Sequence, residues 1–139
     1  MPYQRDLAGS ARRHRQAADK LHAEVKSGQK PGNRAVAGYL FGLAGELALK
    51  ELMSRSGMRP LEQRRDDPYY AHFPELKTLL RNHASGRLSQ RLFRFVLDDS
   101  FFQHWDTDMR YAPTADVREQ WVSRWKADAE SIMQHMDSM

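Results

Sequence analysis

The chain has 139 residues, a formal net charge of +4 and no cysteine. A chain of this length can bury a substantial core, and we expect a single domain over residues 1–139. The absence of cysteine excludes disulfides, thiolate zinc sites and thiol catalysis, and it fits a reducing cytoplasm. The first residues lack the apolar run of a signal peptide, and no apolar segment reaches the ~20 residues of a membrane span. We therefore expect a cytoplasmic protein with no membrane contact.

The first part of the chain predicts two helices joined by a turn. Apolar residues over 4–27 recur every three or four positions, which predicts a helix with a narrow packing seam. The run S-G-Q-K-P-G-N at 27–33 predicts a turn, so we expect the second helix to begin at Gly32 or Asn33. Gly57 lies where a C-terminal cap of this second helix belongs.

The second helix is the most informative segment of the sequence. Residues 35–53 are apolar on nearly every side, with Glu46, Lys50 and Glu51 as the polar exceptions. A helix of this kind is typical of the centre of a bundle. Its glycines lie along one face, and we expect a neighbouring backbone to approach this strip closely. The glycines of the strip are Gly38, Gly42 and Gly45.

Shorter elements follow in the middle of the chain. Residues 58–72 contain two prolines and no hydrophobic period, so we expect a long ordered loop, a kind of segment that is often functional. A proline at a helix first turn predicts a third helix that begins at Pro74 and ends before Gly86. Clustered apolar residues over 88–96 predict a fourth helix.

The last part of the chain predicts an irregular segment and one long helix. We expect residues 98–113 to be irregular or partly helical, and the last helix to begin at Thr114 or Asp116 and to continue almost to the end. No segment has the alternation of a strand. The expected fold is therefore an all-α, up-and-down bundle of four to five helices.

Three motifs in a fixed order carry a resemblance to a known family. They are A-G-Y-L-F-G-L-A-G-E-L-A-L-K-E-L-M at 37–53, H-F-P-E-L-K-T-L-L at 72–80 and W-D-T-D-M-R-Y at 105–111. With the long terminal helix, they resemble the HEPN domains of higher eukaryotes and prokaryotes. The resemblance implies a helical bundle that pairs as a two-fold dimer. It also implies either a metal-independent RNase or a non-catalytic module for nucleotide, RNA or protein partners, as in defence and toxin–antitoxin systems.

The catalytic signature implied by the resemblance is an arginine, then four to six intervening residues, then a histidine. Arg110 occupies the arginine position, whereas the three candidate histidine positions are Ala115, Asp116 and Val117. RNA cleavage without a metal needs a general base and a cation, the roles of histidine and arginine. We therefore expect a non-catalytic module. Two matches with six intervening residues lie in other elements, at Arg15–His22 and Arg65–His72.

A catalytic alternative stays open at this point. A metal-independent RNase could use Arg110 with His104 or His72 as a rebuilt base, so the sequence does not decide whether the protein is an enzyme. For a ligand-binding module, the resemblance places a polar pair near the shared cleft, and the third motif adds further residues. The expected ligand-binding residues are Glu46, Lys50, Trp105, Arg110 and Tyr111.

Several of these residues also have a purely structural interpretation. Glu46 and Lys50 have the i, i+4 spacing of an ion pair on one helix. His72 precedes the third helix, where it would act as a cap. Large aromatic residues suit a core or an interface between subunits. The three tryptophans to which this applies are Trp105, Trp121 and Trp125.

Carboxylates surround Arg110 in the sequence. Asp106 and Asp108 form the pattern H-x-D-x-D with His104, and such a cluster could bind a hard cation. We expect instead that these carboxylates begin helices and neutralise Arg110, with Glu46 as a further possible partner of the arginine. We therefore expect no metal and no cofactor.

The amount of apolar surface predicts a homodimer. A helix as apolar as 35–53 needs cover on nearly every side, and a small bundle has few elements to supply it. Val122 and Met133 also lie off the main apolar stripe of the last helix. Obligate dimer interfaces are core-like and bury on the order of 2,000 Å² or more.

Overall fold

The computed structural model describes residues 4–82 and 90–138. Within these ranges the chain contains α-helices and short 3₁₀ helices but no strand, which confirms the expected all-α bundle. None of the described helices combines the length and the apolar character needed to cross a membrane. The α-helices are α1 (Leu7–Lys26), α2 (Arg34–Arg55), α3 (Glu75–Asn82), α4 (Gln90–Val96) and α5 (Glu119–Asp137). The 3₁₀ helices are η1 (Pro31–Asn33), η2 (Pro68–Tyr70), η3 (Thr107–Tyr111) and η4 (Thr114–Asp116).

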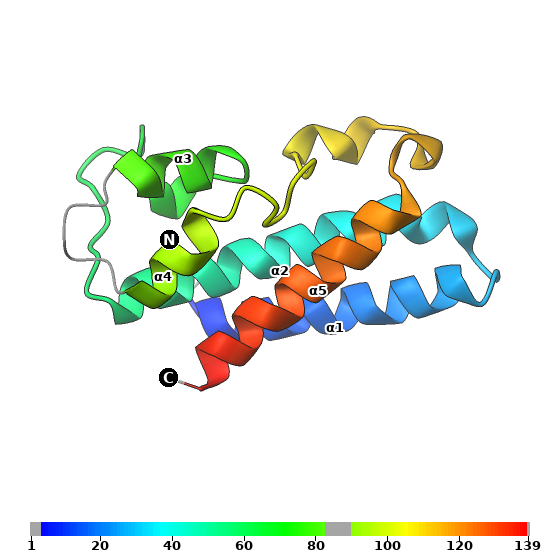
Figure 1. The fold of residues 1–139 in the computed structure, drawn as a ribbon, viewed down its shortest axis with the longest axis horizontal. Coiled ribbons are helices and arrows are strands. Elements are labelled where there is room, and N and C mark those ends of the chain that lie inside the picture. Colours follow the sequence, from blue (N-terminus) through cyan, green and yellow to red (C-terminus); the bar gives the residue numbers. More distant parts are fainter. Residues whose placement is uncertain (1–3, 83–89, 139) are drawn as a thin grey trace.

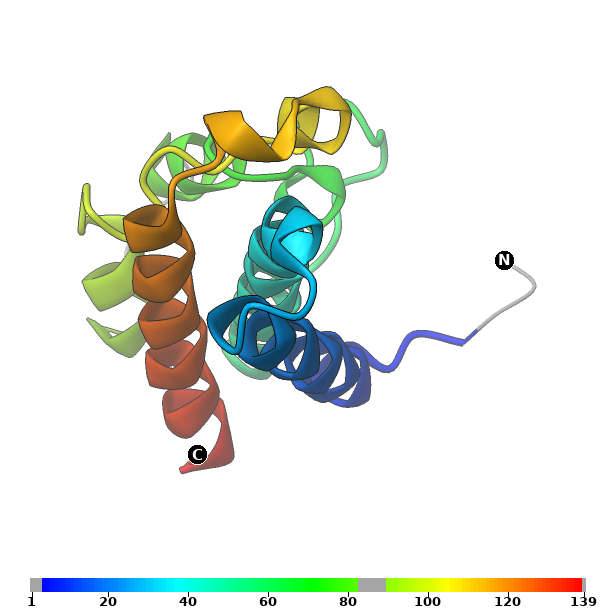
Figure 2. The same ribbon diagram turned by 90° about the vertical axis from the view of Figure 1, so that its right-hand side faces the viewer.

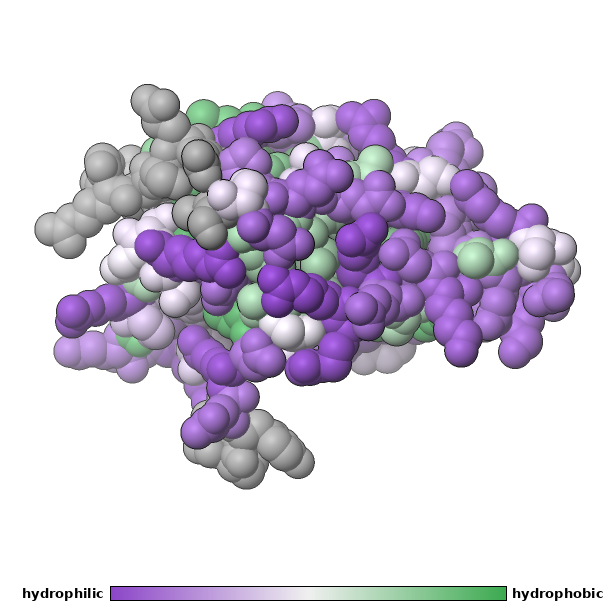
Figure 3. All heavy atoms as spheres, turned by 90° about the horizontal axis from the view of Figure 1, so that it is seen from below, coloured by the Kyte–Doolittle hydropathy of each residue, from purple (hydrophilic) through white to green (hydrophobic). Residues whose placement is uncertain are grey.

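Helix α2 lies at the centre of the molecule (Figure 1). Helix α1 runs antiparallel beside it, and α5 crosses it obliquely while running in the same general direction. The short helices α3 and α4 lie near the C-terminal end of α2, and the segment with η3 and η4 covers its N-terminal end. Figure 2 shows α5 and α1 on two different sides of α2. The outer face of α1 and α5 is mostly hydrophilic (Figure 3).

Aromatic rings, not a backbone, occupy the glycine strip of α2, so the expectation of a close backbone approach is wrong. Each of the three glycines leaves room for a ring that a Cβ atom would overlap. The indole N–H of Trp105 also donates a hydrogen bond to the Gly38 carbonyl at 3.1 Å, which ties the ring to the helix. The ring–glycine pairs are Trp125 at Gly38, Trp105 at Gly42 and Phe102 at Gly45.

Most of the apolar surface of α2 is covered within one chain. Phe41, Leu49 and Met53 are fully buried by the other elements of the bundle. Val122 and Met133, which we expected at a subunit interface, are also buried in the single chain, with exposed fractions of 0% and 3%. The burial of these residues therefore requires no second copy. The homodimer stays a prediction, and its interface must use residues that are exposed in the single chain.

The ends of the helices follow from local residues in most cases. The Asp6 side chain accepts a hydrogen bond from the Gly9 N–H at the start of α1. Gly57 has φ +83° directly after α2, which is the left-handed conformation expected of a C-terminal cap. The expected position of Leu88 in the fourth helix and the end of the third helix before Gly86 lie outside the described residues.

The start of α5 differs from the prediction. The helix begins at Glu119, and Thr114–Asp116 forms the separate helix η4. The cause is a tertiary contact, because the Arg34 side chain of α2 donates hydrogen bonds to the carbonyls of Thr114 and Val117, at 2.9 and 2.6 Å. Val117 is held in an extended conformation between the two helices.

Candidate functional site

Glu46 is the centre of one polar cluster, on the buried side of α2. Its carboxylate is 2% exposed and accepts hydrogen bonds from His72 Nδ1 at 2.8 Å and from the Phe73 N–H at 2.9 Å. The His72 ring therefore fixes the 58–72 loop to α2 and does not cap α3, although its carbonyl accepts from the Leu76 N–H at 2.8 Å. The expected ion pair between Glu46 and Lys50 does not form, because the loop uses the carboxylate oxygens.

Lys50 is a buried cation with few partners. Its side chain is 7% exposed, and among the described residues it makes no hydrogen bond and no ion pair. Burial lowers the pKa of its ammonium group, while the charge of Glu46 raises that pKa and the charge of Arg5 lowers it further. A desolvated charge without a hydrogen bond is unfavourable for folding, and such residues are often functional.

His104 lies in a second place, beside α5. It has φ +72°, and its ring stacks on Trp121 with ring centroids 4.6 Å apart. It lines a cavity of about 310 Å³ together with Lys77, whose ammonium group donates hydrogen bonds to the carbonyls of Asp98 and Phe101. Among the described residues, this cavity contains no arginine.

Trp105 belongs to the core. Its side chain is 1% exposed, stacks on Tyr39 with ring centroids 5.5 Å apart, and donates to the Gly38 carbonyl. Trp125 is equally buried and donates to the Gln103 carbonyl at 2.9 Å. Both rings are therefore packing anchors within one chain, and Trp105 presents almost no surface to a ligand.

Arg110 lies in a third place, on the surface of η3. Its Nε donates to the Thr107 carbonyl at 3.1 Å, and its guanidinium lies 5.0 Å from the centroid of the Tyr111 ring. In the part of the chain that the structure describes, Arg110 makes no ion pair, so the expected pairing with nearby carboxylates is wrong. Asp106 instead caps η3 by accepting from the Asp108 N–H, and Glu46 is occupied by the 58–72 loop.

The three catalytic candidates therefore have separate environments. Arg110 contacts Tyr111, His104 contacts Trp121, and His72 contacts Glu46. The displaced pair Arg15–His22 is also divided, because His22 Nε2 is 2.6 Å from Glu119 while Arg15 faces Asp19 and Glu130. Within the described residues, none of these histidines therefore contacts the arginine with which it would form a catalytic pair.

An apolar groove lies where η3 and η4 pack on the N-terminal part of α2, and we call it the α2–η3 groove. Its volume is about 270 Å³. Val36, on the α2 side, is 51% exposed, and Tyr111, which follows the lining residue Arg110, is 79% exposed. The residues that line the groove are Ala35, Val36, Tyr39, Leu40, Met109, Arg110, Ala112 and Thr114.

Two features of the molecule were not predicted from the sequence. The sequence did not predict that Val36 is exposed, because periodicity places it on the central helix, where apolar residues are expected to be buried. A cavity of about 420 Å³ at the other end of α2 joins Arg5 to Arg59, two residues far apart in the chain. The arginines and tyrosines of the 58–72 loop were the feature of the sequence that could have indicated this cavity, but a search for catalytic pairs does not consider them.

The chain was compared with protein family models, curated protein sequences and solved structures. No protein family model, no curated protein sequence and no solved structure matches this chain.

Proposed function

We propose that this protein is a non-catalytic helical interaction module that pairs with a second copy through the α2–η3 groove. The observation that carries the proposal is an exposed apolar groove beside charges of both signs that have no ion-pair partner among the described residues. Val36 and Tyr111 supply the exposed apolar surface. Large exposed apolar side chains gathered at one place are typical of an interaction site.

The charges beside the groove favour a second copy as the partner. Arg110 is positive, while Asp106, Asp108 and Asp116 on η3 and η4 are negative, and none of them forms an ion pair among the described residues. In a two-fold contact the same surface meets itself, so each arginine can face a carboxylate of the other copy. A uniformly acidic partner would instead be repelled by the three carboxylates, and a uniformly basic partner by Arg110.

The non-catalytic part of the proposal is supported by the separation of the candidate residues. Arg110, His104 and His72 contact different neighbours, so no histidine is placed to serve as the base beside the arginine. The sequence resemblance to HEPN domains favours the same conclusion, because that family pairs as two-fold dimers and includes members without catalysis.

The mass of the protein in solution tests the proposal. Light scattering at micromolar concentration should give twice the 16.2 kDa of one chain. We expect Val36→Glu to shift the mass to that of the monomer, because it places a charge in the apolar centre of the contact. We expect Arg110→Glu to weaken the dimer, and rising salt to do the same.

Leu97→Glu is the matched control. Leu97 is 62% exposed and does not line the groove, so the same change in charge and polarity there should leave the dimer intact. A wild-type monomer would overturn the proposal. A dimer that tolerates Val36→Glu and Arg110→Glu as well as Leu97→Glu would show that another surface pairs.

A further inference from the structure

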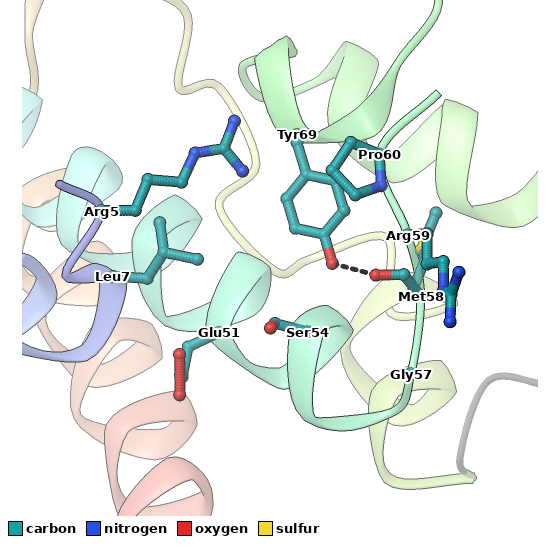
Figure 4. A pocket seen from close by; sticks show the side chains of 9 residues that line it. All are labelled: Arg5, Leu7, Glu51, Ser54, Gly57, Met58, Arg59, Pro60 and Tyr69. Atoms are coloured by element: carbon teal, nitrogen blue, oxygen red, sulfur yellow. Dashed lines mark hydrogen bonds between the residues drawn. The ribbon is translucent and has the colours of Figure 1, made fainter. Parts of the chain in front are cut away.

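We propose that the cavity at the C-terminal end of α2 binds a small phosphate-bearing anion. This inference is independent of self-association, because the cavity lies at the other end of α2 from the groove. Its volume of about 420 Å³ is within the range of small-molecule sites. Figure 4 shows side chains from the N-terminal segment, from the last turns of α2 and from the following loop around one space. The lining residues used below are Arg5, Glu51, Ser54, Arg59 and Tyr69.

Arg5 is oriented by aromatic contacts without being neutralised. Its guanidinium lies 5.6 Å from the centroid of the Tyr69 ring and 5.5 Å from that of Tyr70. It also donates a hydrogen bond to the Tyr70 hydroxyl at 3.2 Å. No carboxylate of the described chain pairs with it. Contacts with two rings hold the cation in place and leave most of its five N–H donors for a ligand.

Arg59 supplies a second cation from the opposite wall of the cavity (Figure 4). It is exposed and has no hydrogen bond, ion pair or ring contact among the described residues. The acidic lining residue Glu51 does not cancel these charges, because its carboxylate accepts from Arg55 Nε at 2.8 Å. The local balance of charge in the cavity is therefore positive.

Lys50 does not line the cavity, but it lies close enough for the charge of Arg5 to act on it. It is more than nine-tenths buried, makes no hydrogen bond in the described part of the chain, and precedes Glu51 on α2. The charge of Arg5 acts on it and lowers the pKa of its ammonium group. An anion held by Arg5 would offset that repulsion and so reduce the cost of burying Lys50.

A phosphate group fits this arrangement better than a carboxylate. A phosphate monoester carries a charge of about −1.5 to −2 and three acceptor oxygens, so it can engage two guanidinium groups at once. The Ser54 hydroxyl is a neutral donor in the same lining. The Tyr69 hydroxyl already donates to the Met58 carbonyl at 2.6 Å, which fixes the ring as a wall of the site.

Calorimetric titration with inorganic pyrophosphate tests this site on the full chain. We expect saturable binding by the wild type, and about tenfold weaker binding by Arg5→Gln and by Arg59→Gln. The double variant should lose measurable binding. Arg59 makes no contact in the described chain, so Arg59→Gln changes the charge with no effect on folding.

Arg94→Gln is the matched control, because Arg94 is exposed, does not line the cavity and contacts only the Phe95 ring among the described residues. Its binding should equal that of the wild type. The absence of saturable binding below about 1 mM would overturn the proposal, as would an equal loss in all three single variants. A single-stranded oligonucleotide that binds in place of pyrophosphate, with the same dependence on Arg5 and Arg59, would identify backbone phosphates as the source of the anion.

Discussion

Lys50 and Lys77 are buried to the same degree but have different contacts. Their side chains are 7% and 8% exposed, and burial lowers the pKa of both ammonium groups. Lys77 donates hydrogen bonds to the carbonyls of Asp98 and Phe101, which have no helical partner after α4. Lys50 has no such bonds. A buried lysine therefore stabilises the fold at position 77 through its hydrogen bonds and destabilises it at position 50.

The first prediction compares Lys50→Met with Lys77→Met. Lys50→Met removes an unpaired buried charge and keeps the aliphatic volume, so it should raise the free energy of unfolding by about 1 kcal/mol. Lys77→Met leaves the Phe101 carbonyl without its donor and removes one of the two donors of the Asp98 carbonyl, so it should lower that free energy by about 1–3 kcal/mol. Urea denaturation at neutral pH measures both. Destabilisation by both variants to the same extent would mean that Lys50 has a stabilising partner.

The second prediction concerns the pH dependence of the same residue. The pKa of Lys50 is lower in the folded protein than in the unfolded chain, so the unfolded chain binds more protons between the two values. Stability therefore rises with pH through that window, which ends near the ordinary lysine pKa of about 10.4. The advantage of Lys50→Met over the wild type should shrink as the pH approaches 10.

Urea titrations of the two proteins at matched pH values measure this difference. Burial raises the pKa of Tyr69, which gives a change of the opposite sign in the same range, but this contribution is shared by both proteins and cancels. A difference between the two proteins that stays constant up to pH 10 would contradict the assignment to Lys50.

At the scale of the element, α2 depends on its glycines for packing. A Cβ atom at Gly42 would overlap the indole of Trp105, which is 1% exposed and bonded to the Gly38 carbonyl. Tyr39 stacks on the ring and, with the hydrogen bond, holds it in place. The cost of roughly 1 kcal/mol for a glycine within a helix is thus offset by aromatic burial.

The third prediction is that Gly42→Ala destabilises the protein in spite of its gain in helix propensity. Overpacking of a filled core costs about 1–3 kcal/mol, which exceeds the ~1 kcal/mol that alanine contributes to a helix. Thermal unfolding should show a lower midpoint. Gly32→Ala is the control, because a Cβ atom at Gly32 meets nothing within 4 Å. An unchanged midpoint in Gly42→Ala would mean that Trp105 can move aside.

The helices differ in how well the sequence predicted where they begin and end. Periodicity and local caps are short-range signals, so α1, α2 and the Gly57 cap were predicted from the residues themselves. The start of α5 was not, because Arg34 holds the carbonyls of Thr114 and Val117 from a distant part of the chain. A local sequence pattern cannot reveal a contact with a residue 80 or more positions away.

The candidate sites were predicted less well, for the same reason. Arg110 and Tyr111 do lie beside an exposed groove, whereas Trp105 is buried in the core. The contact between Arg5 and Tyr70 joins residues 65 positions apart, and only the fold brings them together. The role of Glu46 as the partner of His72 also depends on where the loop folds back onto α2.

At the scale of the whole molecule, the fourth prediction is an absence of RNase activity. Purified protein with a chelator present should not cleave single-stranded RNA, because the candidate bases His104 and His72 have partners elsewhere. General-base assistance is typically worth about 10²–10⁴-fold, so its loss leaves no rate above background. Cleavage by the wild type that Arg110→Ala abolishes would contradict the prediction and would make His104 and His72 the next residues to replace.

The position of the groove and the cavity on one helix has a consequence for avidity. Val36 and Ser54 are 18 positions apart on α2, or about 27 Å at 1.5 Å per residue. A pair of chains joined through their grooves would carry its two anion cavities at the outer ends. Such a particle would be bivalent, and a ligand with two suitably spaced phosphates would be held by both ends at a high effective concentration.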